Sequence, residues 1–414
     1  MPKNTNIISN ANDTNSFIYK SNNDFVQFLF FLLQRNKNTK FKLKTDIYKG
    51  SYDKKQYPFV HSFTSLLLLK ILNNMNLQCP FWKNNIKFTK SITDYKVKYK
   101  LLSGIYSIAG NGLPNGFDLA CIVSTVPSDN VKDKMYPYTM MKKVSEHFNV
   151  IILKSKCHHL CFTFSSIVCK SGLNMKTSHL NNRRLVNQIT SWKSLAKKKT
   201  ISKALCYSIS EVPSLTLYRY LQRNAFELSE WNIILFQIAF TMCLLQKEIP
   251  GFVHHNLTPK HIYLKKVPKG GQFVYKIGKK RYYVPNCGYI VKILPSIYSY
   301  ANKLYENDVV YNEELQVSMG LNSENTGFYD FHLFLNTLYH TRNVPDTIKA
   351  NIRKLLPSET ISNKNSSVIV NHRLRKESQV RNNKSFRSLL KSDICDGFKG
   401  VHKNKIVFYP QVSL

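Results

Sequence analysis

The sequence predicts an α+β protein, in which a small β-rich part is followed by a larger helical part. Between residues 98 and 212, short runs of apolar and β-branched residues alternate with glycine-rich or polar turns, which is typical of strands. After residue 213, apolar residues recur at helical spacing. Helical patterns also precede residue 98, so we expect a helical N-terminal extension. The expected segments are residues 1–97, 98–212, 213–356 and a basic C-terminal tail, 357–414.

The chain carries a formal net charge of +36, with 60 Lys and Arg residues against 24 Asp and Glu residues. Such a charge attracts polyanions, which include nucleic acid, anionic lipid headgroups and acidic proteins. A second interpretation is compositional, because the many Asn, Lys, Ile and Tyr residues suggest an AT-rich genome, which by itself raises the lysine content. Hydrophobic residues make up 43% of the chain and aromatic residues 13%, which excludes wholesale disorder.

The nine cysteines are odd in number and scattered, which favours free thiols in a reducing compartment. Cys157, His158, His159 and Cys161 stand close enough in sequence to suggest zinc, but a second ligand pair at a defined spacing is missing. We therefore expect buried or half-exposed thiols and no metal site here.

The N-terminal extension contains two apolar helical patterns, residues 25–33 and 63–72. We expect the extension to pack on the part that follows; a docking surface for a partner is the alternative. Both runs are shorter than the roughly 20 residues that span a bilayer. No signal peptide is recognisable either, so we expect a soluble protein without a transmembrane segment.

A glycine-rich turn separates two apolar strand patterns, residues 101–109 and 117–123. Its glycines, Gly110, Gly112 and Gly116, follow the spacing G-x-G-x-x-x-G. Such a turn either covers the phosphates of a nucleotide or closes an ordinary β-hairpin.

Residues 138–142 are expected to form the next strand and to present a lysine to nucleotide phosphates. Lys142 is the first candidate and Lys143 the second, although a surface role suits either lysine in so basic a chain. Glu146 is the nearest acidic partner, at an awkward position. Residues 205–212 are expected to form a further strand that leads into the helical part.

The central stretch of the chain is an apolar helix that begins near Ser229, a polar loop over residues 252–261, and an apolar strand. The loop contains His254, Asn256, Leu257 and His261 at the spacing H-x-N-L-x-x-x-H. Basic residues then alternate with apolar ones around a glycine turn, which predicts a basic β-hairpin over residues 265–288.

Two later features follow the helix, loop and hairpin just described. The apolar strand 289–294 ends at Pro295, and a helix begins with Asp330 in its first turn. Together with the loop, this order resembles the serine/threonine protein kinases of nucleocytoplasmic large DNA viruses, of the iridovirus and ascovirus sort. The resemblance spans about residues 100 to 356 and is strongest from 229 to 340.

The resemblance implies a two-lobed kinase fold, a viral origin and a place in the host cytoplasm, the viral factory or the virion. His254 and Leu257 match the catalytic-loop motif. Asp330 is expected to hold the backbone of that loop, which is a structural task. ATP is expected, if it binds at all, at the glycine turn and Lys142.

The departures from the motif concern the chemistry. Asn256 stands where the catalytic aspartate belongs, His261 where the metal-binding asparagine belongs, and Pro295 where the magnesium-binding aspartate belongs. A general base contributes roughly 10²- to 10⁴-fold in rate. A lone imidazole also suits Mg²⁺ poorly. We therefore predict a pseudokinase that is not an enzyme, with no intact catalytic residue, no bound magnesium and no required cofactor.

Three functions remain open at this point. The first is a basic scaffold or regulator that docks a viral or host protein, such as an active kinase. The second is a virion structural or nucleic-acid-binding protein that uses the kinase fold as a carrier, with binding that falls as salt rises. The third is an atypical active kinase.

Overall fold

The structure is a computed structural model. It describes residues 87–97, 100–109, 119–127, 137–155, 157–174, 182–375, 384–399 and 412–413, with short gaps at residues 214, 268, 302–303, 305–306 and 322–326. The helices expected at 25–33 and 63–72 lie outside these residues. So do Gly110, Gly112 and Gly116 of the expected glycine turn.

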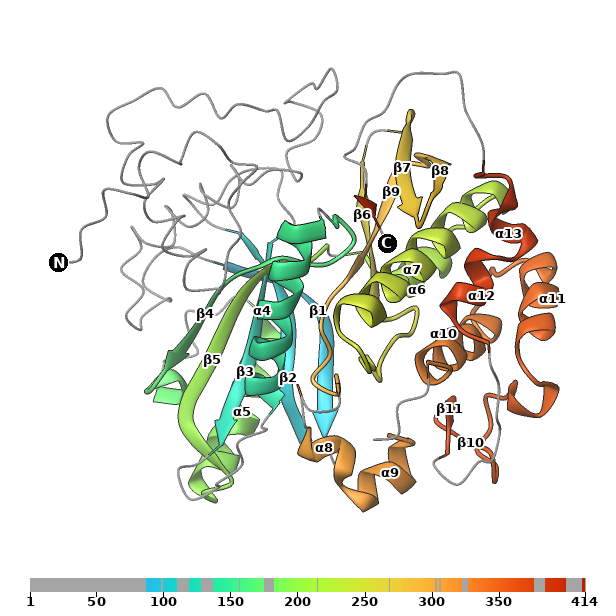
Figure 1. The fold of residues 1–414 in the computed structure, drawn as a ribbon. Coiled ribbons are helices and arrows are strands. Elements are labelled where there is room, and N and C mark those ends of the chain that lie inside the picture. Colours follow the sequence, from blue (N-terminus) through green and yellow to red (C-terminus); the bar gives the residue numbers. More distant parts are fainter. Residues whose placement is uncertain are drawn as a thin grey trace, which may run out of the picture.

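A five-stranded antiparallel sheet in the order β1-β2-β3-β5-β4 forms the first half of the fold (Figure 1). Helix α4 contacts β2, β3 and β4, and α5 contacts β5. The elements are β1 (Lys87–Val97), β2 (Lys100–Ala109), β3 (Leu119–Pro127), α4 (Pro137–Ser155), β4 (Thr163–Cys169), α5 (Arg183–Lys197) and β5 (Ile201–Glu211).

The strand expected over residues 138–142 is wrong, because these residues open helix α4. Met140, Val144, Phe148 and Ile151 recur every three or four residues, and all four side chains are buried. This apolar face, continued well beyond Lys142, makes the helix the stable alternative.

Helix α7 (Leu228–Glu248) is the centre of the second half of the fold. It begins with a capping box, in which the side chain of Glu227 contacts the backbone of Glu230 and the side chain of Glu230 contacts the backbone of Glu227. Fourteen residues of the helix are buried. The other helices of this half are α6 (Leu217–Leu221), α8 (Asp308–Tyr311), α9 (Glu313–Met319), α10 (Tyr329–Tyr339), α11 (Asp346–Leu355), α12 (Phe386–Leu390) and α13 (Asp393–Asp396).

Helix α7 is also long and apolar enough to cross a membrane, and 72% of its most apolar window is buried inside the structure. A core helix of a globular fold has the same properties. The expected absence of a transmembrane segment rests on two shorter runs, residues 25–33 and 63–72, and stays a prediction.

Two small sheets lie against α7. Strand β6 (Ile262–Lys266) pairs with β9 (Tyr289–Ile293), and between them β7 (Gln272–Ile277) pairs with β8 (Lys280–Pro285). The β7–β8 hairpin is the one expected within residues 265–288.

The segment expected to be a basic C-terminal tail contributes buried residues to the main hydrophobic cluster. Helices α12 and α13 pack on α7, and β12 (Val412–Ser413) pairs with β7. Phe386, Leu389 and Cys395 are buried there. Scattered basic residues concealed this apolar pattern in the sequence.

The fold is therefore a mixture of helices and small antiparallel sheets, which is compatible with a kinase-like fold. The division into two lobes and the helical N-terminal extension stay predictions. Seven cysteines in the described ranges are free and buried, whereas Cys169 is disulfide-bonded, which differs from the expectation of free thiols throughout.

Candidate functional site: the loop between α7 and β6

The loop that follows α7 is held by one carboxylate. Asp330, in the first turn of α10, accepts hydrogen bonds from the backbone nitrogens of His254 at 2.6 Å and His255 at 2.9 Å. Burial raises the pKa of Asp330 to about 7, against the opposing effect of these two backbone donors. Both of its oxygens are engaged, so Asp330 acts on the loop as an anchor.

His255 adopts a left-handed backbone conformation, with φ of 59°. A residue with a Cβ rarely takes this conformation, so the surroundings must compensate for the strain. The Asp330 contact to its backbone is one compensation. Its side chain supplies another, since its Nδ1 donates to the carbonyl oxygen of Tyr298 at 2.8 Å.

His254 connects the loop to the segment after β9. Its Nε2 donates to the carbonyl oxygen of Leu294 at 2.8 Å, and its Nδ1 accepts from the backbone nitrogen of Asn256 at 3.2 Å. Burial lowers the pKa of His254 to about 4, so the ring is neutral near pH 7. Leu257 is fully buried in the main hydrophobic cluster.

Asn256 and His261 are in direct contact. The Nδ2 of Asn256 donates to Nε2 of His261 at 3.0 Å, so the ring proton lies on Nδ1, which donates to Thr258 Oγ1 at 2.9 Å. Burial, together with the nearby charge of Arg373, lowers the pKa of His261 to about 3. His261 is therefore a neutral ring with both nitrogens engaged.

Arg373 reaches the loop from far along the chain. It lies in β11 (Arg373–Leu374), which pairs with β10 (Ile369–Val370). Its guanidinium donates to the carbonyl oxygen of His255 at 3.3 and 3.4 Å and to Oδ1 of Asn256 at 3.1 Å. Arg373 falls within the segment that we expected to be a basic C-terminal tail, and nothing near it in sequence indicates this contact.

Pro295 lies in the segment after β9, which contacts the loop through Leu294 and Tyr298. It directly follows Leu294, whose carbonyl oxygen accepts from His254, and it is buried. The three substituted positions, Asn256, His261 and Pro295, thus come together around His254. No Asp or Glu occurs between Glu248 and Glu306, so the loop and this segment contain no carboxylate.

Lys142 lies elsewhere. It is exposed on α4, and the described contacts of the loop do not include it.

A different lysine, Lys292 of β9, is buried in the interior of the protein. It donates to Oε2 of Glu211 at 2.9 Å and to the carbonyl oxygen of Leu160 at 3.3 Å. Glu211 ends β5, so this pair connects the five-stranded sheet to β9. The sequence signal was a single lysine inside the apolar strand 289–294.

Apolar side chains fill the space between the five-stranded sheet and the loop region. Tyr263 and Tyr298 are buried in one cluster with residues of β2, β3 and α4. The other buried members are Ile105, Ala120, Ile122, Met141, Cys161, Val212, Leu294, Ile297, Leu315 and Leu321. In this conformation a nucleotide at that place would have to displace the cluster.

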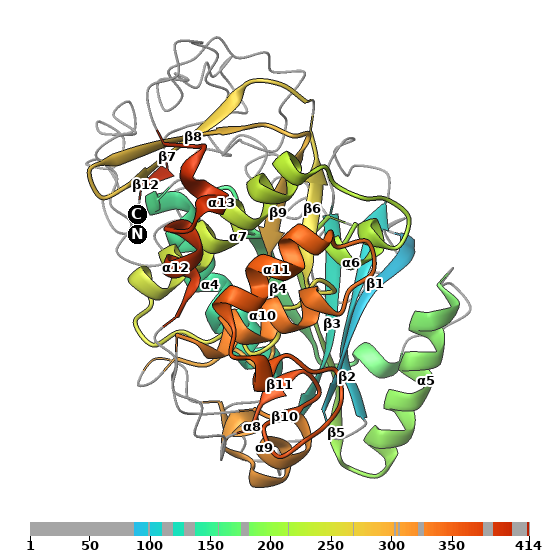
Figure 2. The same cartoon turned by 90° about the vertical axis from the view of Figure 1, so that its right-hand side faces the viewer.

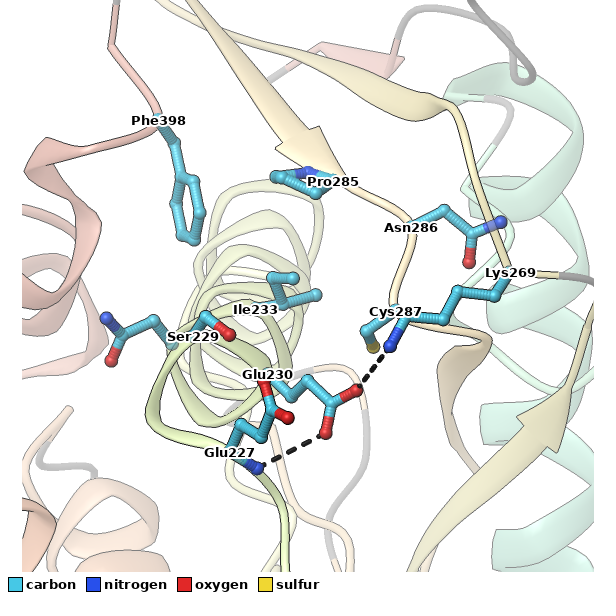
Figure 3. A pocket seen from close by; sticks show the side chains of 10 residues that line it. Glu227, Ser229, Glu230, Ile233, Lys269, Pro285, Asn286, Cys287 and Phe398 are labelled. Carbon is cyan, nitrogen blue, oxygen red and sulfur yellow. Dashed lines mark hydrogen bonds and ion pairs between the residues drawn. The ribbon is translucent and has the colours of Figure 1, made fainter.

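A pocket of about 350 Å³ lies at the opposite end of α7 (Figure 3). It is lined by Glu227, Ile233, Cys287 and Phe398, and an ion pair of 3.0 Å joins Lys269 and Glu230 at its edge. The pocket lies at the N-terminal end of α7, whereas the loop follows the C-terminal end of this helix, and the two share no lining residue. The pocket is therefore separate from the candidate site.

The buried Cys157–Cys161 segment contains neutral histidines. His159 contacts the carbonyl oxygen of Val291 at 3.0 Å and the hydroxyl of Tyr275 at 2.8 Å, and burial lowers its pKa to about 3. These contacts use both nitrogens of His159 within the fold.

No family model matches the sequence. A putative serine/threonine-protein kinase, R400, of Acanthamoeba polyphaga mimivirus is 23% identical over 213 residues, which is 48% of this chain and 44% of that protein. The chain is kinase-like. It spans less than half the length of the curated relative it matches.

This comparison corrects one prediction. We expected a chain that is not an enzyme, but the relative is described as a kinase, which points to an enzyme. The pseudokinase interpretation drawn from Asn256, His261 and Pro295 therefore does not hold. The placement among iridovirus and ascovirus kinases and the roles of the individual site residues stay predictions.

Proposed function

We propose that the chain is an atypical kinase-like phosphotransferase that acts on serine or threonine hydroxyls. The observation that carries the proposal is the anchoring of the loop by Asp330, together with the contact of His254 to Leu294. The similarity to a protein described as a viral serine/threonine kinase supports it.

The proposed reaction is slow, because the loop has no carboxylate to accept the hydroxyl proton. Phosphoryl transfer in kinases depends mainly on positioning and electrostatic stabilisation, and the missing base accounts for roughly 10²- to 10⁴-fold in rate. In place of the base, the Asn256 amide is held between Arg373 and His261 and can orient a hydroxyl group. The buried guanidinium of Arg373 supplies positive charge where negative charge develops.

The residues at the substituted positions do not fit Mg²⁺. This ion prefers oxygen ligands in octahedral geometry. Pro295 offers no side-chain ligand, His261 offers a neutral ring with both nitrogens engaged, and the Asn256 oxygen accepts from Arg373. We therefore propose no step that depends on a metal bound by these three residues.

Entry of ATP requires the apolar cluster around Tyr263 and Tyr298 to open. Both tyrosines are almost fully buried, at 0% and 4% exposure. The conformation described above is thus proposed to be the closed form of the enzyme, and the open form to be the one that binds nucleotide.

The test is transfer of labelled γ-phosphate from ATP by the full chain to acidic and basic protein substrates, with Mg²⁺ and with EDTA. We expect slow labelling of serine or threonine that is lost in Asn256→Ala and kept in Lys197→Ala, an exposed residue of α5. Circular dichroism confirms that both variants fold. Labelling that is absent from the wild type, or that is the same in Asn256→Ala, overturns the proposal.

A further inference from the structure

The β7–β8 hairpin presents a compact group of cations. A two-residue turn at Gly278 and Lys279 joins the strands, and Lys276 pairs with Arg281 across them. Figure 2 shows the hairpin extending from the body of the protein beyond α7. Four exposed side chains form what we call the basic tip: Lys276, Lys279, Lys280 and Arg281.

The basic tip is not neutralised within the described part of the chain. The ion pairs there involve other lysines, and the surrounding stretch from residue 249 to residue 305 contains no Asp or Glu. Like charges directly opposite each other on two strands destabilise a hairpin, as Lys276 and Arg281 do here. An external anion removes this repulsion.

The hairpin is rigidly mounted. Tyr275 packs on Phe236 and Phe240 of α7, with ring centroids 5.0 and 4.8 Å apart. Strand β12 pairs with the outer edge of β7, and the backbone nitrogen of Tyr283 donates to Phe398 at 2.9 Å along the edge of β8. The cations are thus presented from a fixed backbone, whose edges are already paired.

We propose that the basic tip docks on the phosphate backbone of duplex DNA. Lysine and arginine contacts to phosphate need no particular base sequence, so four exposed cations on a fixed backbone are sufficient for this docking. A bilayer surface would also require apolar side chains that insert. The exposed large hydrophobic residues of the described ranges lie outside the hairpin, whose aromatic residues Phe273, Tyr275 and Tyr282 are buried and whose Tyr283 is half-buried.

The test measures binding of the full chain to a fluorescent 20-base-pair duplex by anisotropy, without ATP, between 50 and 200 mM salt. For four phosphate contacts the slope of log K against log salt contains a contribution of about −3.6. The quadruple variant Lys276→Gln, Lys279→Gln, Lys280→Gln, Arg281→Gln is expected to lose about this much slope and roughly tenfold or more in affinity.

A matched control removes the same charge elsewhere, with Lys170, Lys197, Lys198 and Lys203 changed to Gln. These exposed lysines lie in or next to β4, α5 and β5, on the other side of the protein (Figure 1). Melting temperatures confirm that both variants fold.

The control variant, with Lys170, Lys197, Lys198 and Lys203 changed to Gln, is expected to keep most of the slope of log K against log salt. Equal losses in the two variants would show that only the overall charge matters, which overturns the proposal. An unchanged slope in the tip variant, or tip-dependent binding to phosphatidylserine vesicles without binding to DNA, also overturns it. Because no phosphate transfer is measured, either result leaves the proposed enzyme activity untouched.

Discussion

The carboxylate oxygen Oδ2 of Asp330 lies 2.6 Å from the backbone nitrogen of His254, across 76 residues of chain. This contact connects the start of α10 to the loop that follows α7. It holds the loop in a strained conformation at His255, and the contacts among Asn256, His261 and Arg373 depend on that conformation.

Removing the Arg373 side chain is expected to destabilise the loop. Arg373→Met leaves the His255 carbonyl and the Asn256 oxygen without this buried donor, so the free energy of unfolding should fall by about 2–3 kcal/mol. Arg373→Lys should recover part of it, because an ammonium cannot reproduce the guanidinium fork. Urea unfolding measures both. The control is Arg387→Met, at an exposed arginine on α12, for which the free energy of unfolding should change by less than about 0.5 kcal/mol. Equal losses of stability in Arg373→Met and Arg387→Met would contradict the proposed role of Arg373.

The ion pair between Lys292 and Glu211 should show strong coupling. Removing one partner leaves a buried charge, so Lys292→Met or Glu211→Gln should each cost about 3–5 kcal/mol of stability. The double variant should cost clearly less than the sum, because it leaves no unpaired charge. A double-mutant cycle from denaturant unfolding checks this, and simple additivity would show that the pair does not connect β5 and β9 energetically.

The buried histidines should make the protein sensitive to acid. Burial lowers the pKa of His159 and His261 to about 3 and of His254 and His332 to about 4. The unfolded chain therefore binds these protons first, near pH 6.5, and stability present above that pH is lost as the pH falls toward 4. Each proton contributes about 1.4 kcal/mol per pH unit.

The titration of Asp330 changes the free energy of unfolding in the opposite direction between about pH 4 and pH 7. Its pKa is raised to about 7, so its contribution is fully present below about pH 4 and is lost as the pH rises through 7. The four histidines outnumber it, and the net free energy of unfolding should fall on acidification. The slope of the free energy of unfolding against pH, measured between pH 6 and pH 5, should fall by the equivalent of about one proton in His159→Gln. A slope that is flat or rises toward acid would contradict these assignments.

Opening the apolar cluster should favour nucleotide. Tyr298→Ala removes a side chain that fills the space between the five-stranded sheet and the loop, at a cost of about 3 kcal/mol in stability. If the closed form limits ATP entry, the KM for ATP should fall in this variant. Leu304→Ala, at a residue that is 51% exposed, is the control. A KM that is unchanged in Tyr298→Ala while the protein remains folded would show that the cluster does not gate the site.

The sequence predicted the central part of the site because its signals are local. Trp231 to Leu245 repeat at helical spacing, and the loop from His254 to His261 follows at once, so helix, loop and strand could be placed. The helix that begins near Asp330 was placed for the same reason.

The missed residues act over long distances in sequence. Arg373 lies 117 residues from Asn256, and Lys292 lies 81 residues from Glu211. Neither pair has a local pattern, because hydrogen bonds between distant segments are set by the tertiary fold. Lys142 was misplaced because a short apolar run before a lysine suits a strand as well as a helix, and only the later apolar residues Phe148 and Ile151 decide for the helix.

The most direct test of the proposed activity is to return a carboxylate to the loop. Asn256→Asp supplies a proton acceptor next to Arg373, so the rate of phosphate transfer from ATP should rise by about 10²-fold or more over the wild type. A folded Asn256→Asp variant that transfers phosphate no faster than the wild type would contradict the claim that this loop is the catalytic centre of a phosphotransferase.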